Sequence, residues 1–309
     1  MSRDVVLDVD TGADDALALL YALRCADLRV RAVTCVAGNV GLDRVVRNTT
    51  AVVGALRSRV PVAAGTGRPL LTERREFTRV HGDDGMVGVV PPGEPCSLEG
   101  GHAVELLRET ILGAPDPVTV VALAPLTNLA LLARTYPEVV PRVAELRLMG
   151  GSIGPGNVTP VAEFNVWSDP EAAAVVLAAG WPVSMYGMDV FYRPALDSSG
   201  VAALRGSADV AGRLAGEILH NLAVNGPSGR AYLGDAGLVA SLGVDAVTWT
   251  ELPVTVDTRP GLTRGMTVAD RRGPDHEIDA REAWSPVRVA TEVDAAALVS
   301  RYTQVLVRH

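Results

Sequence analysis

Short apolar runs alternate with helical segments along most of this sequence, and this alternation limits the possible folds more than any other feature. The expected strands cover residues 5–7, 28–36, 60–63, 118–123, 143–149 and 183–186. The expected helices cover residues 14–26, 42–56, 102–112, 125–134 and 169–179. Strands separated by helices of this length are typical of βαβ units. The pattern therefore predicts an α/β fold, an open and mostly parallel sheet flanked by helices with a Rossmann-like core.

The last third of the chain follows a different pattern. From about residue 195 to residue 242 it is mainly helical, strand-like segments return at 247–256, 266–270 and 287–293, and a final helix is expected at 294–307. We find no internal repeat, low-complexity tract or linker that divides the chain. Residues 1–309 are therefore expected to form one α/β domain with a helical lobe in its C-terminal third.

Charge and residue usage exclude several classes of function. The formal net charge of −8 argues against a nucleic-acid partner, which needs a basic surface, and no apolar run is long enough to span a membrane. All 28 Lys+Arg positions are arginine, so a Schiff-base lysine and a phosphate-binding loop of the G-K-[ST] type are excluded. The start of the chain lacks signal-peptide character. Cys25, Cys35 and Cys96 have no metal-type spacing and form no obvious disulfide framework, so we expect reduced thiols and a cytoplasmic protein.

Four carboxylates follow the first expected strand within eight residues: Asp8, Asp10, Asp14 and Asp15. In an open α/β sheet, ligands bind beyond the carboxyl ends of the strands, where this cluster lies. Like charges at such a spacing repel one another, and oxygen donors without nearby His or Cys favour a hard cation, Ca²⁺ or Mg²⁺. The structural alternative makes Asp14 and Asp15 first-turn helix acids and Asp10 a turn former, but the density of carboxylates favours the metal.

The segment Asp8-Val9-Asp10-Thr11-Gly12-Ala13-Asp14-Asp15 resembles the D-x-D-x-G-x-D-D signature of the nucleoside hydrolases, calcium-dependent enzymes that cleave the N-glycosidic bond of ribonucleosides. That family usually has Pro where Thr11 stands. Further matches follow in order along nearly the whole chain: Gly38-Asn39, residues 81–86, 125–128, 149–151, Asn157, 162–165, 169–173, 187–189 and 265–270. The resemblance implies a ribonucleoside substrate, and a homodimer or homotetramer.

The resemblance also implies roles for individual residues. The calcium ligands would be Asp10, Asp15, the backbone carbonyl of Leu123, and Asp235, and Asp10 would also orient or deprotonate the attacking water. The ribose hydroxyls would be held by Asp14, Asn39, Asn157, Glu163 and Asn165. Carboxylate and amide oxygens suit a sugar that becomes positively charged in the transition state. Taken alone, without the other family matches, Asn39, Glu163 and Asn165 would be interpreted as ordinary turn or loop residues. Asn128 is interpreted as structural.

Protonation of the leaving base is the part that departs from the family pattern. Several members place a histidine directly before the calcium-binding aspartate, whereas this chain has Gly234-Asp235, and glycine is no acid. His81 is one candidate donor. Aromatic stacking on the base is a second possibility, with Trp167, Tyr232 and Trp249 as candidates. A third is a substrate whose leaving group departs without an acid, which we rank slightly ahead, or else a slow or specialised enzyme.

Two other classes fit parts of the pattern. A haloacid-dehalogenase-type phosphatase would use Asp8 as nucleophile and Asp10 as acid, but Asp14 and Asp15 and the later ribose-type motifs disfavour it. A nucleoside- or ribose-binding protein would keep the site and lose the chemistry. Hydrolysis of an N-riboside by calcium-activated water is the function that the sequence favours.

Overall fold

The computed structural model describes residues 2–74, 80–226, 228–272 and 284–307. Its centre is a sheet of nine strands in the order β10-β9-β11-β6-β5-β4-β1-β2-β3. The strands of this sheet are β1 (Arg3–Val9), β2 (Leu28–Cys35), β3 (Val62–Ala64), β4 (Val118–Ala122), β5 (Val143–Met149), β6 (Val183–Tyr186), β9 (Val247–Val256), β10 (Thr267–Ala269) and β11 (Ser285–Val293). Among the described strands of this sheet, the antiparallel pairs are those of β9 with β10 and with β11, so the sheet is mostly parallel as predicted.

The strand order confirms the Rossmann-like core. Strands β3 to β6 follow the order 3-2-1-4-5-6, in which the direction of winding reverses between β1 and β4. Such a reversal opens a crevice at the carboxyl ends of the two strands, and ligands of α/β proteins bind there. Residues 8–15 and residue 123 leave the sheet at this point.

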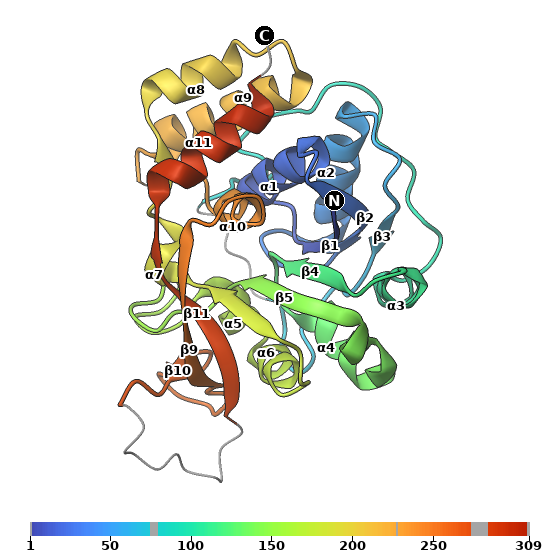
Figure 1. Cartoon of the computed structure of the whole chain (residues 1–309), viewed down its shortest axis with the longest axis vertical. Helices are drawn as coiled ribbons and strands as arrows, with labels where there is room; N and C mark the ends of the chain where they lie inside the picture. Colours follow the sequence, from blue (N-terminus) through green and yellow to red (C-terminus); the bar gives the residue numbers. More distant parts are fainter. Residues whose placement is uncertain (1, 75–79, 227, 273–283, 308–309) are drawn as a thin grey trace.

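Helices cover both faces of the sheet (Figure 1). They are α1 (Ala13–Arg24), α2 (Leu42–Ala55), α3 (Ala103–Gly113), α4 (Thr127–Thr135), the 3₁₀ helix η1 (Pro137–Arg142), α5 (Phe164–Ser168), α6 (Pro170–Leu177), α7 (Met188–Phe191), α8 (Ser198–Arg205), α9 (Val210–Asn225), α10 (Asp235–Ala240) and α11 (Ala295–Leu306). The buried side chains form two apolar layers. One lies under α1, α2, α9, α10 and α11, and the other under α3, α4 and α6.

The predicted helical lobe is present: α8, α9 and α11 pack together at one end of the molecule (Figure 1). The hydroxyl of Tyr302 in α11 donates to the carbonyl of Leu17 in α1 at 3.2 Å, which ties the lobe to the sheet layer. Within this stretch the prediction of mainly helix misses a two-stranded sheet of β7 (Ala195–Leu196) and β8 (Ala231–Tyr232). Two residues are too few to show the alternation that marks a strand. No helix in the described ranges has the length and apolar character to cross a membrane.

Candidate active site

The turn between β1 and α1 forms the floor of the site. Because β1 ends at Val9 and α1 begins at Ala13, only three residues make the turn. The carboxylate of Asp15 accepts the backbone N–H of Asp10 at 3.2 Å and that of Gly12 at 3.0 Å, so it closes the turn from the first turn of the helix. Asp15 therefore stabilises the conformation of the turn in addition to contributing negative charge.

Asn39, at the end of the neighbouring strand β2, joins this turn. Its backbone N–H donates to Asp10 Oδ2 at 2.6 Å and its Nδ2 to Asp15 Oδ2 at 3.3 Å. The approach requires Gly38, because a Cβ there would lie 2.0 Å from Asp10 Oδ2, well inside contact distance. Gly38-Asn39 is thus the cradle that orients two of the acids.

Asp8 has a structural position, unlike the other acids of the cluster. It is fully buried, and its Oδ1 accepts hydrogen bonds from Thr34 Oγ1 at 2.6 Å and Asn128 Nδ2 at 2.8 Å. Burial raises the pKa of Asp8 to about 6. A carboxylate enclosed between strands is inaccessible as a nucleophile, which removes the phosphatase alternative, and the bonds of Asn128 agree with its structural interpretation.

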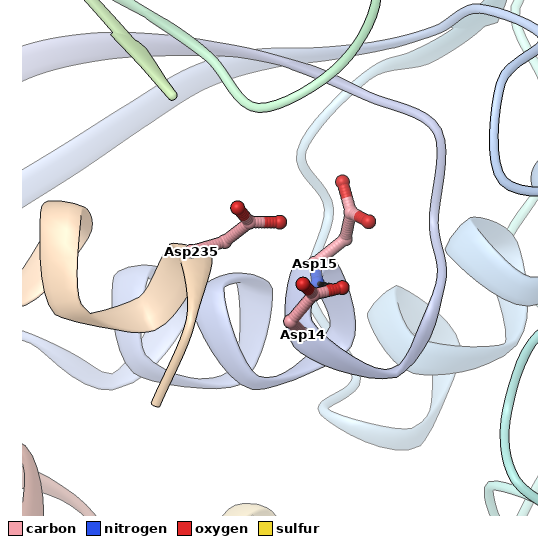
Figure 2. Close-up of side chains that lie close together, drawn as sticks. All are labelled: Asp14, Asp15 and Asp235. Carbon is pink, nitrogen blue, oxygen red and sulfur yellow. Dashed lines mark hydrogen bonds between the residues drawn. The ribbon is translucent and has the colours of Figure 1, made fainter. Parts of the chain in front are cut away.

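Three carboxylates converge above the turn. One oxygen from each of Asp14, Asp15 and Asp235 lies within 4.8 Å of the others, with Asp235 reaching in from the start of α10 (Figure 2). Asp10 is fully buried, and its Oδ1 has no hydrogen-bond partner among the described residues. Burial, reinforced by the neighbouring carboxylates, raises the pKa values of Asp10, Asp15 and Asp235 well above the usual range.

This arrangement fits a divalent cation. All the converging donors are oxygens, as hard cations prefer, and Leu123 lines the same pocket. An orphaned buried carboxylate oxygen costs desolvation energy that a bound cation offsets. The geometric cluster differs in one member from the set implied by the family resemblance, because Asp14 lies beside Asp15 and Asp235 where the resemblance placed Asp10.

The predicted ribose-binding residues share one pocket with the acids. The described residues lining it include Asp14, Asn39, His81, Leu123, Asn157, Glu163, Asn165 and Asp235. Asp10 and Asp15 are fully buried beneath it. Residues from six separate segments thus meet at the switch point of the sheet, which we name the ribose pocket.

Glu163 and Asn165 are held rigidly at the wall of the ribose pocket. Glu163 precedes α5, and its carboxylate accepts the N–H groups of Gly151 and Asn165, both at 2.8 Å. Asn165 Nδ2 donates to the carbonyls of Leu123 at 3.0 Å and Met149 at 3.1 Å. Burial raises the pKa of Glu163 to about 7. The helix-capping role and a ribose-binding role are compatible at these positions.

His81 lies where the ribose pocket opens into a second, more apolar pocket. Its Nδ1 accepts the N–H of Ala13 at 3.2 Å and lies 3.6 Å from Asp14 Oδ1. An imidazole nitrogen that accepts a hydrogen bond carries no proton, so the neutral ring has its proton on Nε2. His81 lines both pockets.

The second pocket, which we name the leaving-group pocket, has an aromatic wall of Phe191, Tyr192 and Tyr232. The Tyr192 ring lies 5.0 Å from the Phe191 ring and 5.0 Å from the Tyr232 ring, centroid to centroid. Of the three aromatic candidates from the sequence, only Tyr232 lines it. Trp249 lies between Arg147 and Arg288 on the sheet, and Trp167 packs beside Gly265. The sequence analysis missed Phe191 and Tyr192. The signal available for them was their position just after the Gly187-Met188-Asp189 motif.

Gly234 borders the leaving-group pocket in a conformation suited to glycine alone. Its φ is +54° and its ψ is −127°. A Cβ here would lie 3.0 Å from Asp14 Cβ and 3.0 Å from Phe191 Cζ. A histidine at this position would therefore meet two obstacles: the positive φ of the backbone, and the Phe191 ring beside the place where its Cβ would lie.

The fold and the site together define a class of α/β hydrolase in which carboxylates gather beside a pocket at the switch point of a mostly parallel sheet. The family described as inosine-uridine preferring nucleoside hydrolase matches residues 5–300. The pyrimidine-specific ribonucleoside hydrolase RihA of Salmonella arizonae is 36% identical over 277 residues, covering 87% of this chain and 89% of the relative.

Solved structures agree. A plant nucleoside hydrolase superposes with a TM-score of 0.92 at 26% identity, covering 100% of both chains. A purine-preferring ribonucleoside hydrolase from Gardnerella vaginalis gives 0.84 at 26% identity, covering 98% of this chain and 99% of that one. The chain belongs to the inosine-uridine preferring nucleoside hydrolase family and is an N-glycosyl hydrolase. This assignment does not favour a binding protein without activity.

Proposed function

We propose that this enzyme hydrolyses the N-glycosidic bond of a ribonucleoside with the help of Ca²⁺, giving ribose and the free base. The observation that carries the proposal is the convergence of Asp14, Asp15 and Asp235 beside the unpartnered Oδ1 of Asp10 at the foot of the ribose pocket. Asp10, Asp15, Asp235 and the carbonyl of Leu123 would hold the ion. When bound, Ca²⁺ supplies positive charge that acidifies water and orients the ribose hydroxyls.

The chain's own residues perform the remaining tasks. Asp10 is buried with one free oxygen, so it accepts the proton of the attacking water as general base. Asp14, Asn39, Asn157, Glu163 and Asn165 hold the ribose hydroxyls in the pocket that they line. Their carboxylate oxygens also face the anomeric centre as it gains positive charge. His81 at the junction of the two pockets contacts the substrate where sugar and base meet.

The test is a panel of ribonucleosides, including inosine, uridine, cytidine and adenosine, assayed with and without EDTA. Free base is quantified by chromatography. We expect base release from at least one nucleoside, its loss in EDTA, and its return with excess Ca²⁺ but not with Na⁺. Release that is unaffected by EDTA contradicts the metal assignment. No release from any nucleoside contradicts the choice of substrate.

The proposal extends to the state of the protein in the cell. Cys25, Cys35 and Cys96 are free thiols, which suits the reducing cytoplasm. The sheet joins strands from β1 to β11, which supports one domain over the whole chain. From the family resemblance we expect a homodimer or homotetramer, and light scattering coupled to size-exclusion chromatography measures it directly.

A further inference from the structure

Arg230 is the only arginine among the described residues that line the leaving-group pocket. Its guanidinium carbon lies 5.7 Å from the centroid of the Tyr232 ring, which is part of the aromatic wall. Its guanidinium forms no ion pair with any described carboxylate, in contrast to Arg24, Arg205 and Arg264, which pair with acids of their own. A positive charge thus stands unneutralised beside the place where a base would leave.

The backbone holds Arg230 in this place. It directly precedes β8, whose pairing of Ala231 with Leu196 and of Tyr232 with Ala195 joins it to β7. Its own N–H donates to Ser228 Oγ at 3.3 Å. The side chain is exposed, so its charged group faces water until a ligand fills the pocket. A guanidinium in this position lies within reach of a ligand without the cost of a buried charge.

The need for such a charge follows from Gly234. Glycosidic cleavage leaves an electron pair on the base nitrogen, and a base that departs without a proton departs as an anion. The backbone at Gly234 and the ring of Phe191 exclude an acid at that position. His81 has its Nδ1 engaged as an acceptor from the N–H of Ala13. Arg230 is the only arginine among the described residues that line this pocket, and its guanidinium can stabilise the negative charge.

We propose that Arg230 stabilises the leaving base as an anion, in place of the proton donor that is absent at position 234. The substrates would be ribonucleosides whose bases carry a carbonyl oxygen or ring nitrogen that spreads this charge. This inference rests on the proposed function. The C1′–N bond breaks with both electrons going to the base, the water oxygen bonds to C1′, and the water proton passes to Asp10. The base anion takes a proton from solvent after it leaves the pocket.

The test compares Arg230→Met with the wild type on two kinds of nucleoside. Uridine or inosine, whichever the wild type cleaves faster, leaves as an anion, whereas nicotinamide riboside carries a positive ring and leaves as a neutral base. We expect kcat on the first to fall about 10- to 100-fold, the range of a charge-assisted hydrogen bond. On nicotinamide riboside we expect kcat unchanged or increased. Arg134→Met, at an exposed arginine on α4, is the matched control.

Two further readings separate this role from a structural one. Guanidinium ion added to Arg230→Ala should restore part of the lost rate on the anionic leaving group and none on nicotinamide riboside. A guanidinium keeps its charge at neutral and alkaline pH, so wild-type kcat should stay level from about pH 7 to 9, where an imidazolium donor would lose its proton. An equal loss on both nucleosides, or a kcat that falls through this range, overturns the role of Arg230.

The outcomes also distinguish this inference from the proposed function. If the wild type releases base and Arg230→Met does so at the same rate on every nucleoside, only the role of Arg230 is wrong. If the wild type releases no base from uridine, inosine or nicotinamide riboside, the proposed function fails, and the role of Arg230 fails with it.

Discussion

The two pockets of the site are built by different means. The ribose pocket is fixed by buried hydrogen bonds, many from backbone N–H groups, as at Asp10, Asp15 and Glu163. The leaving-group pocket is made by side-chain packing, with an aromatic wall whose middle ring, Tyr192, is 46% exposed. Sugar and cation demand a fixed geometry, whereas a wall of rings can be exchanged without disturbing the sheet. We therefore expect the leaving-group pocket, proposed to bind the base, to be the half of the site that is free to change within one fold.

The largest effect on activity is expected from a substitution of Asp10, beside the ribose pocket. Asp10→Asn removes the general base and should lower kcat by about 10²- to 10⁴-fold. The asparagine oxygen can still accept the N–H of Asn39, and burial raises the pKa of Asp10, so the neutral side chain should leave the metal-free Tm unchanged or higher. Steady-state kinetics and calorimetry measure both quantities.

The matched control for this variant is Asp116→Asn, at an exposed aspartate in the loop before β4. It should alter neither kcat nor Tm. An Asp10→Asn enzyme within tenfold of wild type would show that a different group accepts the proton of water, and would remove the functional contrast between the two pockets.

The second effect tests whether the leaving-group pocket simply lacks a histidine. Gly234→His should not restore an acid, because the new Cβ meets Asp14 and Phe191 and the backbone has positive φ. We expect a loss of stability of about 1–3 kcal/mol from backbone strain, and a loss of kcat/KM rather than a gain. Denaturant unfolding and kinetics on inosine and uridine measure these changes.

Gly113→His, at a helix end where an added Cβ would have no other atom within 4 Å, controls for adding a histidine as such. It should remain close to wild type in both measurements. A large gain in activity from Gly234→His would mean that the pocket is an ordinary family site missing one side chain, and that Phe191 moves aside easily.

Much of this contrast was invisible in the sequence for a physical reason. Strands β5, β6 and β9 begin and end where the sequence patterns predicted, and most residues of β5 and β6 are buried, which makes these two strands distinct apolar runs. The acids of the ribose pocket were predictable because they occupy fixed positions in a short turn. The convergence of Asp14 with Asp235 was not, since it depends on how α10 packs against α1.

The leaving-group pocket was the least predictable part. Phe191, Tyr192 and Arg230 come from segments about 40 residues apart, joined through the two-residue strands β7 and β8 that carry no periodic signal. The sequence reveals Gly234 as a missing histidine, but it does not reveal the positive φ that makes the position unsuited to one. Dihedral angles and packing across the chain decide this half of the site.

The third effect concerns the aromatic wall. Tyr192→Leu removes the ring that contacts both Phe191 and Tyr232, and should raise KM about tenfold, in the range that stacking of a base on an aromatic ring contributes. Tyr192→Phe keeps the ring and should recover most of this affinity. Equal effects from the two substitutions would mean that the hydroxyl, rather than the ring face, contacts the substrate.

The smallest expected effect is the pH dependence of KM that Glu163, in the ribose pocket, would cause. Burial raises the pKa of Glu163 to about 7, so the carboxylate is protonated at lower pH and ionised above that value. An ionised carboxylate accepts a hydroxyl hydrogen bond more strongly, by about 1 kcal/mol, so KM should fall about fivefold as pH rises through the pKa. A bound divalent cation favours ionisation and moves the midpoint downward.

In Glu163→Gln, KM should stay high and level with pH. The same midpoint in that variant would assign the titration to another group. We expect Asp10 to act on kcat and Glu163 to act on KM, so one pH series separates the proposed general base from the proposed sugar-binding carboxylate.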